Sequence, residues 1–352
     1  MTKQYIEESV ELLKRMVAIS SISRNEGEVA DMIQESVACM GLKVNRDGNN
    51  LWVLQEAWAE GKPTVLLNAH IDTVKPASGY TRDPFAPTIE GDTLWGLGTN
   101  DDGASVVSLL AAFRYLSTKT DLPYNLIWSA TAEEEVSGKN GVESILGKLG
   151  RIEFGIVGEP TGMQMAVAEK GLMVLDCTTE GVSGHAARNE GVNAIYKALP
   201  IVEWFRTKQW EKVSPFLGPV KMSVTQIDAG TQHNVVPDKC HFVVDVRVND
   251  LYKNQELLDL IKGDEHTKEC TVQERSTRLN SSHIDVDHPI VKKALGMDIK
   301  LFGSPTLSDQ ALMSFPTVKI GPGDSAMSHT ADEYIKISEI ENAVATYVKL
   351  LS

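Results

Sequence analysis

The sequence predicts an α/β protein. We expect a larger domain with a mixed, largely parallel sheet flanked by helices, plus an inserted smaller α+β domain with an antiparallel sheet. Two observations lead to this prediction. Over residues 1–165 and again over 283–352, apolar strand patterns alternate with helical patterns, which is the order of an open α/β sheet. Over 166–282 the patterns change to strands that alternate in polarity with helices between them, so we expect an insertion in the first domain.

The spacing of apolar residues predicts the elements in the first part of the larger domain. Apolar residues at three- and four-residue steps predict helices at 5–19 and 27–41, and Gly41 ends the second helix. A loop rich in Gly, Pro and Asp is expected from Lys75 to Asp92. The other elements expected here are strands at 43–47, 50–55, 64–71, 126–131 and 154–158, and helices at 104–117 and 140–149.

The inserted domain comes next in the chain, and the last part of the larger domain follows it. In the insertion we expect strands at 171–180, 219–227 and 240–248, an extended stretch at 269–279, and helices at 191–210 and 253–263. The α/β order then resumes with a helix from Pro289, strands at 298–302 and 316–320, and a last helix at 338–351.

Composition excludes several classes of protein. The chain has 352 residues and a net charge of −14, with 48 acidic against 34 basic residues, which argues against a nucleic-acid or anionic-membrane surface. No apolar stretch approaches the ~20 residues of a membrane span, and the N-terminal segment reads as an amphipathic helix rather than a signal peptide. The 4 cysteines form no CxxC pair, so we expect reduced thiols and a cytoplasmic location.

The stretch 64–74 contains the first candidate for chemistry. Val65, Leu66 and Leu67 form a short apolar run, and the strand then ends on His70 and Asp72. A period of two places these last two side chains on the same side of the strand. An Asp is a usual partner that fixes the tautomer of a metal-binding His, although a single His at a strand end is more often structural.

Carboxylates recur at the ends of the next predicted strands. Three of them, at 133–135, follow the strand 126–131, and Glu159 follows the strand 154–158. Open α/β sheets place their ligand sites at such ends, although a solvated charge run is the alternative reading for 133–135. Asp101 and Asp102 precede the helix 104–117, where acidic residues also favour the positive end of the helix dipole. The recurrence at three strand ends favours a ligand site.

A second histidine, His329, follows the strand 316–320 and the loop Gly321-Pro322-Gly323. The candidate set is then His70, Asp101, Glu135, Glu159 and His329, with Glu134 beside it. Two imidazoles and three carboxylates suit a pair of zinc-like cations. Three carboxylates and one hydroxide carry four negative charges, which two divalent ions balance. Without metal, these anions would repel one another in one cleft.

Seven motifs carry a resemblance to a known family. They are HIDTV at 70–74, GTNDD at 98–102, TAEEE at 131–135, GEPT at 158–161, GHAA at 184–187, NVVP at 234–237 and SHTADE at 328–333. Their order resembles the di-zinc amidohydrolases that include acetylornithine deacetylase, succinyl-diaminopimelate desuccinylase, carboxypeptidase G and aminoacylase, over nearly the whole chain. The residues of the motifs GLGTNDD, TAEEE and GEPT are most similar to those of the branch that contains acetylornithine deacetylase and succinyl-diaminopimelate desuccinylase. Of these two enzymes, the chain most resembles acetylornithine deacetylase.

The resemblance implies a role for each residue of the set. Asp101 would bridge two divalent ions, which would be zinc, with cobalt as an alternative. His70 and Glu159 would hold one ion, and Glu135 and His329 would hold the other. Asp72 would orient His70, and Glu134 would be the general base. The resemblance also implies a cis peptide between Asp101 and Asp102. One departure is that Gly103-Ala104 stands where the family usually has Lys-Gly.

The resemblance extends to the inserted domain. It implies that His185 donates to the developing oxyanion, and that the inserted domains pair in a homodimer so that each histidine serves the partner's cleft. The Pro that usually follows this histidine is missing. Asn234 is the main candidate for substrate binding, with Arg247 and Gly321 as further candidates. A turn position for Asn234 and a structural place in a strand for Arg247 are the alternatives.

The function implied is removal of an N-acyl group, acetyl or succinyl, from a small amino acid such as ornithine, with a bridging water as nucleophile and Glu134 as base. A dipeptidase or carboxypeptidase with the same metals is an alternative, as is succinyl-diaminopimelate desuccinylase. A non-catalytic relative is a third reading, against which the presence of Glu134 argues.

Overall fold

The computed structural model describes residues 3–188 and 190–352, which divide into two compact units. The first comprises the residues up to Val167 together with His283–Phe302 and Ser308–Ser352. The second comprises Ala168–Ser282 and a short return, Gly303–Leu307. This return was not predicted. It belongs to the second unit because Gly303 packs against the backbone of Phe216, so closely that a Cβ would clash there.

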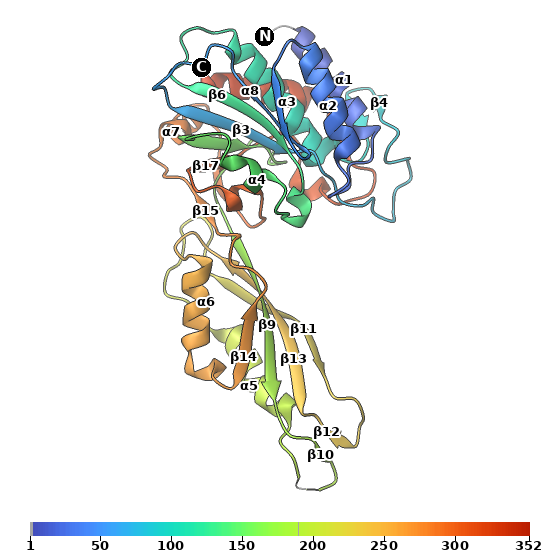
Figure 1. The fold of residues 1–352 in the computed structure, drawn as a ribbon, viewed down its shortest axis with the longest axis vertical. Coiled ribbons are helices and arrows are strands. Elements are labelled where there is room, and N and C mark those ends of the chain that lie inside the picture. The colour runs from blue at the N-terminus through green and yellow to red at the C-terminus, as the bar shows by residue number, and fades with distance from the viewer. Residues whose placement is uncertain (1–2, 189) are drawn as a thin grey trace. The chain divides into compact units, whose positions relative to one another are not determined.

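The first unit is built on a nine-stranded sheet whose order is β1-β2-β6-β3-β7-β17-β8-β15, with β16 paired to β8 (Figure 1). Its four central strands are parallel: β6 (Asn125–Thr131), β3 (Thr64–His70), β7 (Phe154–Val157) and β17 (Thr317–Lys319). The outer strands are β1 (Val44–Asp47), β2 (Asn50–Leu54), β8 (Met165–Glu169), β15 (Ser282–His283) and β16 (Leu301–Ser304). Because β2 and β8 pair antiparallel with their inner neighbours, the sheet is mixed.

Helices cover both faces of this sheet. They are α1 (Lys3–Val17), α2 (Gly27–Cys39), α3 (Ala104–Ser117), α4 (Val142–Leu146), α7 (Pro289–Leu295) and α8 (Ile337–Leu351). α3 packs on β3 and β6 and is itself covered by α1 and α8. Its sequence is apolar nearly all round, as expected of a helix enclosed on every side. On the other face, Ile145 of α4 and Leu149 just after it pack with Leu66 and Ile127 of the sheet.

A small three-stranded sheet occupies part of the region expected to be a loop. It consists of β4 (Thr88–Glu90), β5 (Thr93–Trp95) and β18 (Tyr334–Lys336) in the order β18-β5-β4. Sequence patterns missed these strands because each has only three residues, too few for alternation to be read. The pairing of β18 with β5 joins residues 93–95 to the segment that follows His329.

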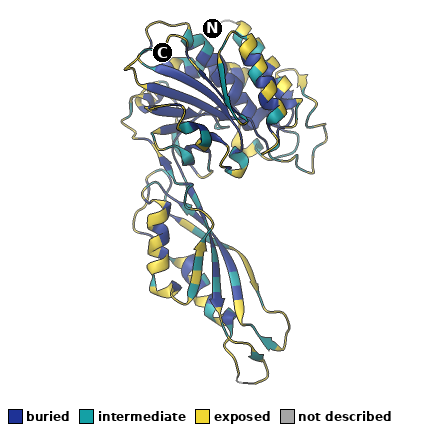
Figure 2. Cartoon of the chain, in the orientation of Figure 1, coloured by how far each residue is buried: buried dark blue, intermediate teal, exposed yellow. Residues whose placement is uncertain are grey.

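The second unit has a four-stranded antiparallel sheet in the order β11-β13-β9-β14. These strands are β9 (Gly171–Glu180), β11 (Lys221–Ala229), β13 (Lys239–Val248) and β14 (Cys270–Glu274). Every second residue of β9 is buried (Figure 2), and these residues share a core with α5 (Ala194–Thr207) and α6 (Asn254–Gly263). A separate two-stranded ladder joins β10 (Gly184–His185) to β12 (Val235–Val236).

The predicted fold class is confirmed: a mixed, largely parallel α/β sheet flanked by helices, and separate antiparallel sheets. Among the described residues, no helix combines the length and the apolar character that crossing a bilayer requires.

Candidate metal centre and active site

The candidate residues of the first unit meet where the central strands end. β3 ends on His70, and Asp72 follows it. β6, β7 and β17 are followed by Glu134 and Glu135, by Glu159, and by the loop that leads to His329. Because these four strands are parallel, their carboxyl ends lie at one edge of the sheet, which is where open α/β sheets bind ligands.

Asp101 lies between the two histidines. It belongs to the turn Thr99–Gly103 at the start of α3, and the Asp101–Asp102 peptide is cis, which confirms that prediction. Its Oδ1 is 3.2 Å from His70 Nε2, and its Oδ2 is 3.8 Å from His329 Nε2. Each oxygen of this carboxyl group therefore faces a different imidazole, as a bridging ligand requires.

Glu135 faces His329. Both of its carboxylate oxygens are 3.0 Å from His329 Nε2. The Glu135 side chain is 9% exposed, whereas that of His329 is 54% exposed. His329 has a φ of 62°, a left-handed conformation that a non-glycine residue adopts only where its surroundings hold it.

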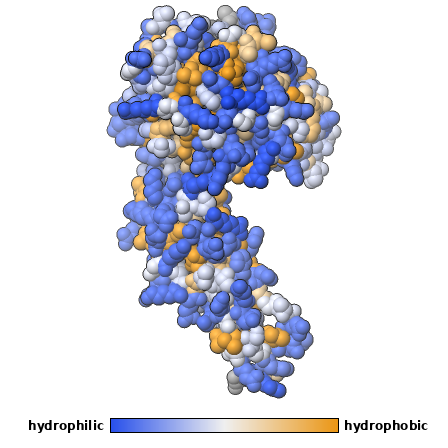
Figure 3. Space-filling model, viewed as in Figure 1, coloured by the Kyte–Doolittle hydropathy of each residue, from blue (hydrophilic) through white to orange (hydrophobic). Residues whose placement is uncertain are grey.

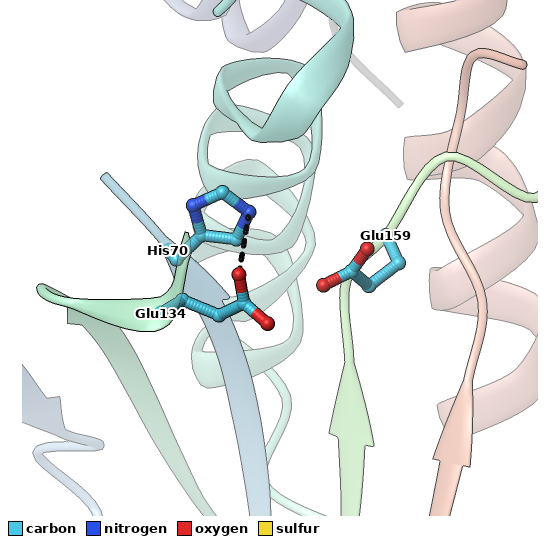
Figure 4. Close-up of side chains that lie close together, drawn as sticks. All are labelled: His70, Glu134 and Glu159. Carbon is cyan, nitrogen blue, oxygen red and sulfur yellow. Dashed lines mark ion pairs between the residues drawn. The ribbon is translucent and has the colours of Figure 1, made fainter. Parts of the chain in front are cut away.

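Glu134 and Glu159 lie on the other side of His70. Figure 4 shows the three side chains pointing into one space, with a Glu134 Oε2 to His70 Nε2 distance of 3.9 Å. Two sets of three residues offer ligand atoms within 4.8 Å of one another: His70, Asp101 and Glu135, and His70, Glu134 and Glu159.

Asp72 does more than the sequence suggests. Its Oδ1 is 3.5 Å from His70 Nδ1, while its backbone carbonyl is closer to the same ring nitrogen, at 2.9 Å. The Asp72 carboxylate accepts the backbone N–H groups of Glu134 and Glu135 at 3.0 and 3.1 Å, and the Ser23 hydroxyl at 2.7 Å. Asp72 therefore fixes the turn that carries both glutamates as well as the His70 ring.

The electrostatics show an excess of negative charge. Burial raises the pKa of Glu134 and of Glu159 well above the usual value, and neighbouring carboxylates add to both effects. Burial likewise raises the pKa of Glu135. Burial would lower the pKa of His70, but hydrogen bonds to Asp101 and Asp72 outweigh it and hold that pKa well above the usual value.

This donor set fits a pair of divalent cations. Imidazole nitrogens and carboxylate oxygens are the ligands that zinc and similar ions take in proteins, and here they converge on a carboxylate with one oxygen toward each histidine. Positive ions would also offset the burial and the mutual repulsion that raise the pKa values of the three glutamates.

Comparisons with known proteins identify the family and the fold. The family model described as peptidase family M20/M25/M40 matches residues 66–352. The chain belongs to this family. Two relatives are the succinyl-diaminopimelate desuccinylases of Paracoccus denitrificans (strain Pd 1222), 24% identical over 98% of each chain, and of Dechloromonas aromatica (strain RCB), 26% identical over 97% of each chain.

Solved structures share the fold over almost the full length. The aminopeptidase PepT of Bacillus cereus ATCC 10987 has a TM-score of 0.79 at 21% identity and covers 98% of both chains. The YXEP protein of Bacillus subtilis, described as a dinuclear metal-binding peptidase of the M20 family, has a TM-score of 0.77 at 14% identity and covers 99% of this chain and 98% of its own. The protein is thus a member of a peptidase and amidohydrolase family, and its fold is that of M20 peptidases.

The structure adds residues to this M20 site that sequence reasoning missed. Asp309, 241 positions away from Asn68, accepts hydrogen bonds from Asn68 Nδ2 at 2.8 Å and from the Thr131 hydroxyl at 2.9 Å, and its charge raises the pKa of Glu134. Glu133, by contrast, turns its carboxylate to Asn140 and takes no part in the centre. The family resemblance already singles out Glu134 and Glu135, and the backbone turn that starts at Glu134 shows why Glu133 does not face the site.

Gly321, predicted to bind substrate, lies against the backbone of Glu159. A Cβ at position 321 would meet the carbonyl oxygen of Glu159 and the Ser105 hydroxyl, each at 2.5 Å. Substrate binding by Gly321 stays a prediction, but these contacts show that a side chain at position 321 would collide with the Glu159 backbone.

We expect Gly321→Ala to displace Glu159, weaken metal binding by at least about tenfold, and lower stability by ~1–3 kcal/mol, the usual cost of overpacking. Metal titration against a chelator and urea unfolding measure the two effects. Gly147→Ala is the matched control, because a Cβ there meets nothing within 4 Å. Equal metal affinity in the two variants would contradict the packing argument.

In the second unit, two of the predicted residues lie side by side. His185 pairs with Val235 in the β10–β12 ladder, and the Ala186 N–H donates to the Asn234 carbonyl at 3.0 Å. Their motifs, GHAA and NVVP, are far apart in sequence. Arg247 instead makes a two-point ion pair with Asp245 within β13, at 2.9 and 3.1 Å, which matches the structural alternative for it.

Proposed function

We propose that this M20 protein is a metal-dependent amide hydrolase that removes an N-acyl group, acetyl or succinyl, from a small amino acid such as ornithine. The observation that carries the proposal is the Asp101 carboxylate with one oxygen toward His70 and the other toward His329, and with Glu134 beside it. Asp101 would bridge two divalent ions, zinc being our first choice and cobalt the second. His70 and Glu159 would complete one site, and Glu135 and His329 the other.

The residues of this chain then have distinct tasks. Two bound divalent ions supply the positive charge that acidifies a water molecule and polarises an amide carbonyl. Glu134 accepts the proton of the water and passes it to the leaving amine. Asp72 keeps Glu134 in place through its backbone N–H, so the base is held by the same group that orients His70. Burial raises the pKa of Glu134 well above its usual value, which suits a base that must later act as an acid.

The acyl group and the amino acid require a direct assay. We propose N-acetyl-ornithine as the first substrate, because the sequence motifs are most similar to that branch; the relatives reported above are desuccinylases and peptidases by name. Turnover of metal-loaded protein should be measured on N-acetyl-ornithine, N-succinyl-ornithine, N-succinyl-diaminopimelate and several dipeptides. A kcat/KM highest for dipeptides would replace the proposal with the peptidase alternative.

We also propose a homodimer built through the second unit. β11 lies at the end of its sheet and exposes Ile227, while α5 exposes Tyr196 and Leu199 with 72% and 52% of their surface accessible. Figure 3 shows further hydrophobic side chains at the end of this unit where β10 and β12 lie. An edge strand beside exposed apolar groups suits pairing with a second copy.

We propose a cytoplasmic location, because the four cysteines are free thiols and reduced thiols are usual in the cytoplasm.

Metal content tests the bridging assignment. We expect wild-type protein purified without chelator to contain up to two ions per chain, and Asp101→Ala to lose at least one, because both sites share this carboxylate. Elemental analysis after gel filtration measures the ratio. Asp31→Ala is the control, since Asp31 pairs with Arg46 on the surface. Two ions bound to Asp101→Ala at wild-type affinity would show that Asp101 does not bridge.

A further inference from the structure

The turn that carries Asp101 has several backbone N–H groups with no partner inside the turn. Those of Gly98, Asn100 and Asp101 instead converge on one side chain, the carboxylate of Glu333. Glu333 Oε1 accepts the N–H groups of Asn100 at 2.8 Å and Asp101 at 2.9 Å, and Oε2 accepts that of Gly98 at 3.0 Å. Successive N–H groups that surround an anion in this way form a strong, charge-assisted site.

Glu333 is well placed to hold this turn rigidly. It is 1% exposed, so water does not compete for its oxygens. Its own backbone carbonyl accepts the N–H of Gly96, and β18, which starts at the next residue, pairs with β5. The carboxylate therefore has little freedom to move, and the turn that it binds is fixed relative to the small sheet.

The same short segment also carries His329. Glu333 lies four residues after this histidine, whose Nε2 is 3.8 Å from Asp101 Oδ2. One segment thus supplies a candidate ligand and also binds the backbone of the residue that faces it. Removing the Glu333 carboxylate would leave three buried N–H groups unpaired, and the turn would have to rearrange to satisfy them.

From these contacts we infer that Glu333 is a positioning residue, which sets the place of Asp101 relative to His329 by binding the backbone of the Asp101 turn. Glu333 is not itself a ligand or a base. The inference deepens the proposed function and rests on it where metal is concerned, but the hold on the turn is a property of the protein alone.

The neighbouring Asp332 provides a matched control. Its carboxylate also accepts three hydrogen bonds, from the Thr81 N–H and hydroxyl and from the Arg82 N–H, but these belong to an outer loop. Both Glu333→Gln and Asp332→Asn replace a carboxylate by an amide of the same shape. In Glu333→Gln one oxygen acceptor becomes an NH₂ group that points at a backbone N–H donor. In Asp332→Asn the NH₂ group can take the place of Oδ2 and donate to the Thr81 hydroxyl, while the remaining oxygen still accepts both backbone N–H groups.

The first measurement is hydrogen exchange by mass spectrometry on metal-free protein. We expect Glu333→Gln to speed exchange in peptides that cover 98–103, and Asp332→Asn to leave exchange in those peptides unchanged. The second is the visible absorption spectrum and affinity of bound Co²⁺. We expect Glu333→Gln to alter the spectrum and to weaken binding by about 10- to 100-fold, and Asp332→Asn to leave both unchanged.

The outcomes are separable. If wild-type protein binds no metal but exchange at 98–103 quickens in Glu333→Gln, the proposed function fails and the hold on the turn stands. If wild-type protein binds two ions and a folded Glu333→Gln matches it in both measurements, the inference is overturned. Should Glu333→Gln not fold, Glu333→Asp replaces it. Its carboxylate is one carbon shorter and cannot reach all three N–H groups, so unchanged exchange and an unchanged Co²⁺ spectrum in that variant overturn the inference too.

Discussion

Glu134→Gln is expected to lower turnover by ~10²–10⁴ while two metal ions stay bound, since general acid–base catalysis contributes about that much. The amide has the shape of the carboxylate but cannot accept the proton of the attacking water. The backbone N–H of residue 134 still donates to Asp72, so the turn keeps its place. Steady-state kinetics and metal analysis of the same sample measure the two quantities.

Glu133→Gln is the matched control for this experiment. Glu133 belongs to the same run of three glutamates, but its carboxylate accepts hydrogen bonds from Asn140 instead of facing the centre. We expect its substitution to leave kcat within a few fold of wild type. Activity of Glu134→Gln within about tenfold of wild type would show that another group is the base. Loss of metal from that variant would show that Glu134 is a ligand, as its place near His70 and Glu159 also permits.

His185→Ala is expected to lower turnover by ~10²–10³ and to leave metal binding unchanged, because a donor to the oxyanion acts on charge that develops in the transition state. The structure suits this role: the Ala187 N–H donates to His185 Nδ1 at 3.1 Å, which leaves the proton on Nε2, and the side chain is exposed. His233→Ala is the control, because His233 is an exposed histidine in the adjacent motif of the same unit.

A complementation assay tests whether His185 serves the partner's site. Chains with His185→Ala are mixed with chains with Glu134→Gln, each nearly inactive, and exchange is followed by light scattering and native mass spectrometry. If the histidine acts across a dimer, each mixed dimer contains one site with both wild-type groups, and activity returns in part. Exchange without recovery would place His185 within its own site or outside catalysis, and a monomeric wild-type protein would remove the shared site altogether.

The fold class could be predicted from sequence for a physical reason. Buried parallel strands need near-continuous apolar runs, and strands with one solvated face need alternation, so the two units differ visibly in pattern. The end of each central strand is equally visible, because a polar run must follow where the chain leaves the core. Hence His70 and Glu159 could be identified as candidates from the sequence. The return at 303–307 and the three strands of the small sheet could not, because they depend on contacts with distant segments.

For the candidate centre, the sequence determined which residue types are available, and the order of its motifs implied a role for each. Only the tertiary structure decided how they are held. In the folded chain the two oxygens of Asp101 face different histidines. The Asp72 carboxylate accepts the backbone N–H of Glu134, and the Glu333 carboxylate accepts the backbone N–H of Asp101. The last two are hydrogen bonds to backbone N–H groups, which every residue but proline carries, so the identity of the donor leaves no trace in the sequence. The acidic acceptors, Asp72 and Glu333, can be read from the sequence, but only the folded structure shows which backbone groups they bind.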